Sequence, residues 1–359
     1  MYFQTKIKII VVFSFSIFAL GLTVKNGSTQ TQVETAGQKF KNIKVLNDMP
    51  ADQLGKVMNI FSASLGVNCN FCHVANDRDF DKDDKKEKAT ARNMIKMAFE
   101  INKGHFNGRP EVTCNSCHNG HNQPTNVPNL SPVAANERPA QPTTKPTIDQ
   151  IVDKYITALG GAAKLAKVTS LTVTASRVES DGKAIEPESI WYKGGKYAAD
   201  TTYGKIVVSE RYDGSTATKY GDPHAITLKP DEADRIRREA ELFAPANLKT
   251  IYPTMDFRFL DRIDGREVYF VAATTASKVR ERLYFDVLTG FLVRRSAATP
   301  TVLGNFIYQV DYADYKSVGG VKMPMTIKYS MPNIRWTRKI IEAKVNAPVD
   351  DAKFMAPKS

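Results

Sequence analysis

The sequence predicts an α + β protein of two domains: a small α-helical domain, then a curved antiparallel β-sheet domain with one or two packed helices. Apolar residues recur at helical spacing over residues 51–65 and 85–103. From Ser170 onward, apolar and polar residues alternate with a period of two, which is typical of strands. Between these parts, residues 122–146 contain six prolines and no hydrophobic periodicity. The 359 residues are enough for about two domains.

The composition is that of a globular protein, with 42% hydrophobic and 25% charged residues, which excludes a wholly disordered or collagen-like chain. The net charge of +12 is shared equally between the two parts of the chain: residues 1–146 carry 18 basic against 12 acidic residues, and residues 147–359 carry 32 against 26. No long polybasic run stands out, so the sequence does not predict a nucleic-acid partner.

The N-terminus carries an export or anchoring signal. Lys6 and Lys8 precede an uninterrupted run of apolar and small residues from Ile9 to Val24. We expect residues 1–28 to be a cleaved signal peptide or an uncleaved N-terminal anchor. Either would place the rest of the chain in the periplasm or otherwise outside the cytoplasm, soluble or membrane-anchored.

The two predicted helices share one arrangement. The apolar face of the first holds Leu54, Val57, Met58, Phe61 and Leu65, and that of the second holds Ala91, Met94, Ile95, Ala98 and Ile101. Pro50 and Gly66 bound the first helix, and Arg109-Pro110 follows the second. Each helix bears methionine and is followed by a turn and a pair of cysteines.

All four cysteines fall into two Cys-x-x-Cys pairs, each followed at once by histidine. The pairs are Cys69 with Cys72 and Cys114 with Cys117, followed by His73 and His118. The pattern C-x-x-C-H is typical of covalent c-type haem attachment, in which two thiols bind the vinyl groups and the histidine is the proximal iron ligand. The sequence therefore predicts two covalently bound haem c groups.

Two other uses of these cysteines stay open. Four thiols can hold one structural zinc ion, although zinc does not require a histidine after each pair, and the two pairs are far apart for a zinc ribbon. Two disulfides are the other alternative, although cysteines so close in sequence suit redox exchange more than cross-linking.

The sixth iron ligand decides between an electron carrier and a haem enzyme. Met58 on the first predicted helix precedes Cys69, and Met94 and Met97 on the second precede Cys114. The residues alone do not separate thioether ligands from ordinary core methionines.

The C-terminal part begins with a helix signal. Thr147 to Gln150 form a capping box before an amphipathic helix, and Gly160-Gly161 ends that helix. Turns between strands are predicted at Gly194-Gly195, Asp213-Gly214, Asp264-Gly265, Thr289-Gly290 and Gly319-Gly320. A further helix is predicted over about 230–243.

Residues 50–124 resemble the cytochrome c subunits of photosynthetic reaction centres. The matching stretches are MPADQLGKVMNIFSASLGVNCNFCH and ARNMIKMAFEIN with VTCNSCHNG. The resemblance implies a helix beside each haem plane, Met58 as the sixth ligand of the first iron, and Met94 as that of the second, with Met97 as the runner-up. The best-known members carry four haems, whereas this chain has motifs for two.

The C-terminal half weakly resembles the curved-sheet domains of periplasmic lipoprotein carriers. The segments TIDQIVDKYITALGG, RLYFDVLTGFLVRR and VDYADYKSVGGVKMPMTIKYS carry this resemblance. It implies a concave face that can hold acyl chains.

The sequence thus predicts a dihaem cytochrome c domain over 40–124, a Pro-rich linker over 125–146 and a curved β domain over 147–359. We expect a non-enzymatic carrier that passes single electrons to and from a redox protein or a membrane electron-transfer complex. The alternatives are a haem peroxidase-type enzyme and a carrier whose β domain holds a hydrophobic or lipid ligand.

Overall fold

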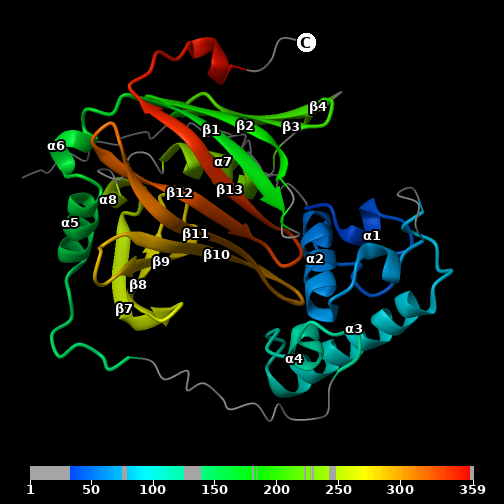
Figure 1. Ribbon diagram of the computed structural model, residues 1–359. Helices are drawn as coiled ribbons and strands as arrows, with labels where there is room; N and C mark the ends of the chain where they lie inside the picture. The colour runs from blue at the N-terminus through cyan, green and yellow to red at the C-terminus, as the bar shows by residue number, and fades with distance from the viewer. Residues whose placement is uncertain are drawn as a thin grey trace, which may run out of the picture.

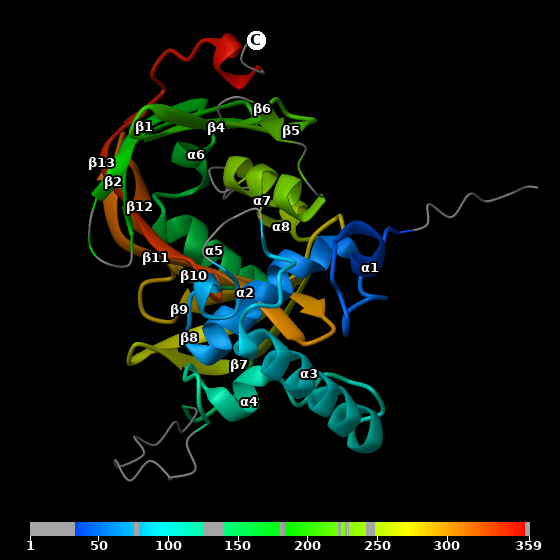
Figure 2. The same cartoon turned by 90° about the vertical axis from the view of Figure 1, so that its right-hand side faces the viewer.

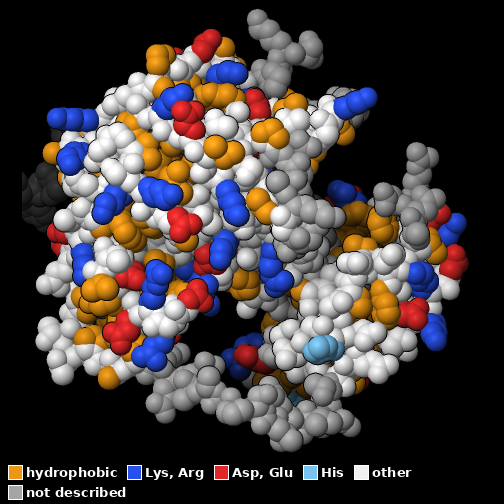
Figure 3. Space-filling model, in the orientation of Figure 1, with side chains coloured by type: hydrophobic (Ala, Val, Ile, Leu, Met, Phe, Trp, Pro, Cys, Tyr) orange, Lys and Arg blue, Asp and Glu red, His pale blue; other side chains and the backbone are white. Residues whose placement is uncertain are grey.

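The computed structural model describes residues 33–74, 79–124, 139–179, 182, 184–221, 224–226, 228, 230–241 and 248–355. The predicted signal or anchor over 1–28 and residues 125–138 of the predicted linker lie outside these ranges. Across the described ranges, no helix is both long enough and apolar enough to cross a membrane. On the face drawn in Figure 3, basic and acidic side chains are interspersed, without a large patch of one sign.

The N-terminal part is helical. Its elements are α1 (Ala36–Lys39), η1 (Ala51–Gln53), α2 (Leu54–Leu65), η2 (Cys69–Phe71), α3 (Lys86–His105) and α4 (Cys114–His118) (Figure 1). Both predicted helices are confirmed, with bounds shifted by a few residues. The first helix ends at Gly66, which adopts φ 65° as a left-handed C-cap, a conformation that glycine reaches without strain.

A small apolar cluster holds this helical part together. Its buried members are Ala36, Leu46, Met49, Val57, Ile95 and Leu303, and half-buried Met58, Phe61 and Phe99 pack against it. Ala36 is fully buried, so the packed helical unit includes residues before position 40. Leu303 is also fully buried, yet it comes from the C-terminal part of the chain.

The C-terminal part contains one large sheet and four helices among the described residues. The helices are α5 (Ile148–Ala158), α6 (Ala162–Leu165), α7 (Pro230–Glu241) and α8 (Leu248–Ile251). The strands are β1 (Ser170–Glu179), β2 (Ala184–Lys193), β3 (Lys196–Tyr203), β4 (Ile206–Tyr212), β5 (Ala217–Gly221), β6 (His224–Ile226), β7 (Thr254–Ile263), β8 (Arg266–Thr274), β9 (Arg280–Asp286), β10 (Leu292–Thr301), β11 (Gly304–Val318), β12 (Val321–Ser330) and β13 (Arg335–Val345). A short 3₁₀ helix, η4 (Asp351–Phe354), follows them.

The described strands form a 13-stranded antiparallel sheet in the order β6-β5-β4-β3-β2-β1-β13-β12-β11-β10-β9-β8-β7. Neighbours in the sheet are neighbours in the chain except at the centre, where β1 pairs with β13 through a register that includes Leu171 opposite Val345. All five predicted glycine turns fall between strands. The prediction of an antiparallel β domain with packed helices is therefore confirmed.

The sheet curves around α5 and α7 (Figure 2). The capping box at Thr147 is present, with its hydroxyl accepting from the Gln150 amide, and it starts α5 as predicted. Tyr155 of α5 packs edge-on against Phe285 at 5.4 Å between ring centroids, and Ile236 of α7 is fully buried. The core of this part thus lies between the concave face and these two helices.

Buried charges also fill the concave side. The Arg338 guanidinium of β13 donates to both carboxylate oxygens of Glu188 at 2.5 and 2.8 Å, and it lies 3.4 Å from Glu239 of α7. Arg295 lies 3.6 Å from Glu281 and 4.0 Å from Glu239. All five side chains are at most 5% exposed, so α7 is tied to the sheet by ion pairs out of contact with water.

The two parts of the chain meet at the β10–β11 hairpin, which reaches α2 in Figure 1. Its tip carries Leu303, which enters the helical cluster. At Gly304 (φ 119°), a Cβ atom would lie 3.0 Å from the Cγ2 of Thr113, the residue that caps α4. Beside it, the Asn333 amide donates to Asn59 of α2 at 2.8 Å.

Replacing Glu210 by Gln is expected to remove part of the acid sensitivity of the β domain. Burial alone would raise the pKa of Glu210, but Arg235 of α7 outweighs it and lowers that pKa from 4.5 to about 2. The resulting stability is present above pH 4.5 and is lost as the pH falls toward 2, a difference of about 3 kcal/mol.

Urea unfolding at a series of pH values measures this difference. Glu342→Gln, on the exposed face of β13, is the control and should keep the wild-type pH dependence. Equal slopes below pH 4.5 for wild type and Glu210→Gln would contradict the assignment.

Candidate haem-binding sites

The first Cys-x-x-Cys-His motif forms one helical turn directly after α2. The His73 amide donates to the Cys69 carbonyl at 3.0 Å, and the Cys72 amide donates to the same oxygen at 3.3 Å. Residues three apart in such a turn lie on the same face, so the thiols of Cys69 and Cys72 are presented side by side. Both cysteines are free of disulfide bonds.

His73 is held by its inner ring nitrogen. Its Nδ1 lies 3.1 Å from the carbonyl oxygen of Phe80, and the two rings meet edge-on at 5.1 Å between centroids. With the proton on Nδ1, the histidine donates to this carbonyl and keeps the Nε2 lone pair for a metal, the arrangement usual for metal-ligating histidines. Burial lowers the pKa of His73 in spite of the bond to Phe80, and the charges of Lys88, Arg92 and Lys85 lower it further, so the ring is neutral at neutral pH.

The second motif repeats this arrangement on α4. Thr113 caps the helix through a capping box with Ser116, and Asn119 ends it in the left-handed conformation. The Nδ1 of His118 lies 2.9 Å from the carbonyl oxygen of His121. Cys114 and Cys117, again three positions apart in a helical turn, are free of disulfide bonds.

A buried asparagine positions the second motif relative to α3. Asn102, only 3% exposed, donates to the carbonyl of Val112 at 2.8 Å and accepts from the amide of the same residue at 2.9 Å. These two bonds satisfy both backbone groups of Val112 and so fix the segment between the end of α3 and Cys114.

The two motifs are also joined to each other. The amide of Gly120, just after α4, donates to the carbonyl of Ser64 in α2 at 2.8 Å. At Gly66, a Cβ atom would lie 2.1 Å from the Gly120 carbonyl oxygen, so only glycine fits there. The chain thus packs the end of the first methionine-bearing helix against the second motif.

The three candidate thioether ligands lie on α2 and α3. Met58 is half-buried against the apolar cluster, whereas Met94 and Met97 are 42% and 44% exposed. Met94 lies one helical turn before buried Ala98 and therefore on the same face of α3. Met97, the neighbour of Ala98 in sequence, points about 100° away around the helix.

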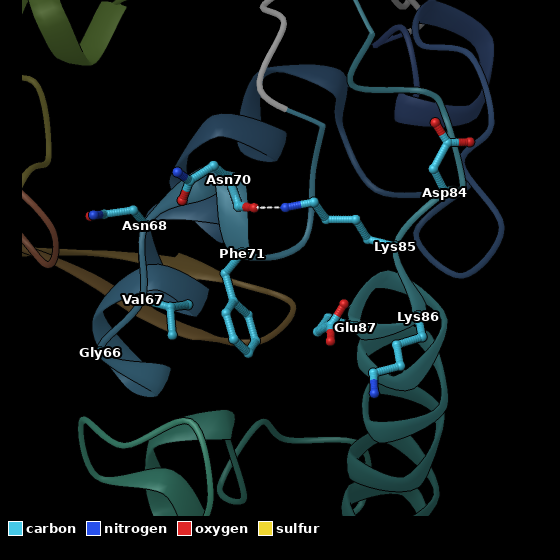
Figure 4. Close-up of a pocket in the computed structure, with 9 residues that line it drawn as sticks. All are labelled: Gly66, Val67, Asn68, Asn70, Phe71, Asp84, Lys85, Lys86 and Glu87. Carbon is cyan, nitrogen blue, oxygen red and sulfur yellow. Dashed lines mark hydrogen bonds between the residues drawn. The ribbon is translucent and has the colours of Figure 1, made fainter.

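A hollow of about 790 Å³ opens to solvent beside the first motif (Figure 4). It is lined by residues 66–68 and 70–71 on one side and by residues 84–87, at the start of α3, on the other. Lys85 spans it and donates to the carbonyl of Asn70. Its volume falls within the range of about 300–1,000 Å³ that is usual for cofactor sites.

The geometry does not favour zinc. Burial raises the pKa of the Cys114 thiol to about 11, and burial followed by Glu87 raises that of Cys72, so both thiols are protonated at neutral pH when no metal is bound. Over the ranges that the structure describes, which include all four cysteines, no three Cys, His, Asp or Glu side chains gather as a metal site. The residues fit covalent haem, because each motif offers two neighbouring thiols and the first offers a neutral histidine that is held at Nδ1.

Several contributors to the sites carry no signal in the sequence. The carbonyls of Phe80 and His121 orient the two histidines, but every residue has a carbonyl, so neither could be identified beforehand. Asn102 is recognisable only as a polar residue on the apolar face of a predicted helix. The methionines lie on helices, as the sequence predicts, and each set of cysteines and histidine lies on a single helical turn; their roles as ligands stay predictions.

The repeated motif is the one by which c-type cytochromes attach haem. Residues 21–164 match the family described as the photosynthetic reaction centre cytochrome C subunit, which confirms the resemblance seen in the sequence. This match covers the helical part and the start of the next, less than half of the chain.

Two curated relatives show the same likeness. The photosynthetic reaction center cytochrome c subunit of Roseobacter denitrificans is 32% identical over 109 residues, 28% of this chain and 29% of that protein. Cytochrome c-554 of Chloroflexus aurantiacus is 30% identical over 129 residues, 34% of this chain and 30% of that protein. The chain therefore spans about three tenths of the length of these relatives.

Solved structures resemble the β domain more distantly. A DUF1329 family protein from Desulfovibrio piger has a TM-score of 0.42 at 10% identity, over 59% of this chain and 98% of that chain. A LolA superfamily protein from Nitrosomonas europaea has a TM-score of 0.40 at 13% identity, over 59% of this chain and 99% of that chain. Likenesses of this size carry no argument about function.

Proposed function

We propose that this protein is an extracytoplasmic dihaem c-type cytochrome that transfers single electrons between redox partners. The observation that carries the proposal is the repetition of one geometry: paired thiols on a helical turn, then a histidine whose Nδ1 lies within 3.1 Å of a backbone carbonyl. A zinc site or a disulfide pair would need neither histidine nor this orientation. A bound haem supplies an iron that accepts and returns one electron.

In this proposal the chain holds each haem through four side chains. Cys69 and Cys72 bind the first haem and Cys114 and Cys117 the second, each through thioether bonds. His73 and His118 ligate the irons through Nε2. Met58 ligates the first iron and Met94 the second, the latter preferred to Met97 because it shares the Ala98 face of α3.

The exposed apolar side chains near the motifs support covered haem sites. Phe80, Met94 and Met97 are large apolar residues that are between 42% and 49% exposed. A flat apolar group docked over them would remove this surface from water.

The partner we propose is a redox protein or a membrane electron-transfer complex. The basic and acidic side chains are interspersed on the drawn face, and the sequence has no long polybasic run, so we do not propose a nucleic-acid partner. The family match supports this kind of partner, while the number of haems is our inference from the two motifs.

A lipid-carrier role for the β domain has less support. The hollow among α5, the β11–β12 turn and the sheet measures about 70 Å³, well below the usual lower limit of about 300 Å³ for ligand sites. Buried Glu239 lies at its wall, and an acyl chain beside a buried carboxylate gains little.

Replacing the methionines separates an electron carrier from a haem enzyme. Thioether ligation stabilises the ferrous state and blocks peroxide from the iron. In the holoprotein, Met58→Ala and Met94→Ala should each weaken the near-infrared sulfur-to-iron band and lower one midpoint potential. Redox titration followed by visible and near-infrared spectra measures both effects.

Met97→Ala is the matched control and should change neither the band nor the potentials. If Met97→Ala removes the second contribution to the band instead, the ligand assignment on α3 is wrong while electron transfer stands. A wild-type protein with high-spin iron and rapid peroxide turnover would overturn the proposal in favour of the peroxidase alternative.

A further inference from the structure

The carbonyl that orients His73 serves two donors. The Phe80 oxygen lies 3.1 Å from Nδ1 of His73 and accepts from the ammonium of Lys88 at 2.8 Å. The shorter of the two contacts is the one to the cation. Charge-assisted hydrogen bonds are about twice as strong as neutral ones, so Lys88 is the stronger of the two donors to this oxygen.

Lys88 is fixed in this position. Its side chain is only 12% exposed, and its ammonium also donates to the Lys82 carbonyl at 2.6 Å and pairs with Asp83 at 3.2 Å. Asp83 is itself held by Lys44 and Arg92, both at 2.9 Å. The ammonium is therefore part of a rigid cluster at the start of α3, rather than a mobile surface charge.

The second site lacks this feature. His118 lies closer to its carbonyl, at 2.9 Å from the His121 oxygen. Within the described ranges, no lysine or arginine is seen to donate to that oxygen. Two motifs that are otherwise alike thus differ in whether a cation shares the acceptor of the histidine.

This difference acts on the electron density of the iron ligand. A carbonyl that accepts strongly from Nδ1–H makes the imidazole a better donor to the metal, which favours the ferric state. A carbonyl oxygen that also accepts from an ammonium forms a weaker hydrogen bond with Nδ1–H, so the imidazole donates less electron density to the iron. The positive charge of the ammonium also disfavours the ferric iron, which carries one more positive charge than the ferrous iron.

We infer that Lys88 is a positioning residue that raises the midpoint potential of the haem at Cys69 and Cys72 above that of the haem at Cys114 and Cys117. This inference rests on the proposed function and adds the direction of electron transfer within the pair: the second haem donates the electron and the first haem accepts it. Lys88 acts through the Phe80 carbonyl and through its charge, since the bonds of its ammonium described above go to Phe80, Lys82 and Asp83.

Redox titration of the full-length holoprotein tests the inference. Lys88→Leu should lower the higher of the two potentials by about 59 mV, which is a tenfold shift in one ferric–ferrous equilibrium. The lower potential should stay in place. Lys88→Arg, which keeps the cation and its donors, should restore the wild-type value.

Lys96→Leu is the matched control, because Lys96 is an exposed cation on the same helix, about two helical turns beyond Lys88. Paramagnetic proton spectra give a second measure, since only the signals of one axial histidine should move in Lys88→Leu. A merely structural role for Lys88 would broaden or lose these signals rather than shift one set.

The outcomes separate this inference from the proposed function. If the wild type retains two haems but Lys88→Leu moves neither potential, or moves one no more than Lys96→Leu does, the inference is wrong and the dihaem proposal stands. If the wild type retains no covalent haem, both fail.

Discussion

A full-length chain with both Cys114 and Cys117 replaced by Ala is expected to retain one covalent haem instead of two. The two thioether bonds are the only covalent links in the proposal, and a histidine ligand alone does not survive denaturation. Mass spectrometry of denatured protein from a host that attaches haem c measures the count directly. The visible haem absorbance should fall by about half.

The mirror variant, Cys69 and Cys72 to Ala, should lose the other haem and also retain one. Asn115→Ala, an exposed position between the second pair of thiols, is the control and should retain both. Retention of two haem masses by either double variant, or a wild type that binds zinc and no haem, would refute the assignment of the motifs.

Arg338→Met is expected to lower the free energy of unfolding of the β domain by about 3–5 kcal/mol. The substitution keeps most of the side-chain length but leaves Glu188 without its two charged bonds of 2.5 and 2.8 Å, and Glu239 without one partner. Glu188 keeps only the Thr201 hydroxyl, at 3.3 Å, and a buried carboxylate without a cation beside it costs several kcal/mol. Urea unfolding followed by far-ultraviolet circular dichroism measures the change.

Lys339→Met is the matched control for this prediction. It removes one positive charge from the next position of β13, where the side chain is exposed, and should change stability by no more than about 0.5 kcal/mol. An Arg338→Met protein as stable as this control would mean that the buried ion pairs do not hold α7 to the sheet.

Local patterns in the sequence are enough to predict most of the elements. The capping box at Thr147, the five glycine turns and the helices before each motif depend on residues within a few positions of one another. The motif residues Cys69, Cys72 and His73 are equally local, since one helical turn brings them together. These features could therefore be predicted and are found where expected.

The features that escaped prediction depend on contacts between distant segments. Arg338 and Glu188 belong to strands in which apolar and polar residues alternate, a pattern that predicts a solvent-facing position for a charged residue. Both are nevertheless buried, on the concave side under α7. The pairing of β1 with β13 joins the first strand of the chain to the last. Leu303 is an ordinary apolar residue, and nothing around it in the sequence indicates that it belongs to the helical core.

The position of Leu303 has a consequence for the order in which the protein is assembled. A chain is made from its N-terminus at about 5–20 residues per second, and Leu303 follows His118 by about 185 residues. At that rate, both Cys-x-x-Cys-His motifs are complete for about 10–40 s before the side chain that fills the cluster beside Met58 exists. During that interval the apolar cluster of the helical segment lacks one of its buried members, and its packing is completed only when the β10–β11 hairpin is made.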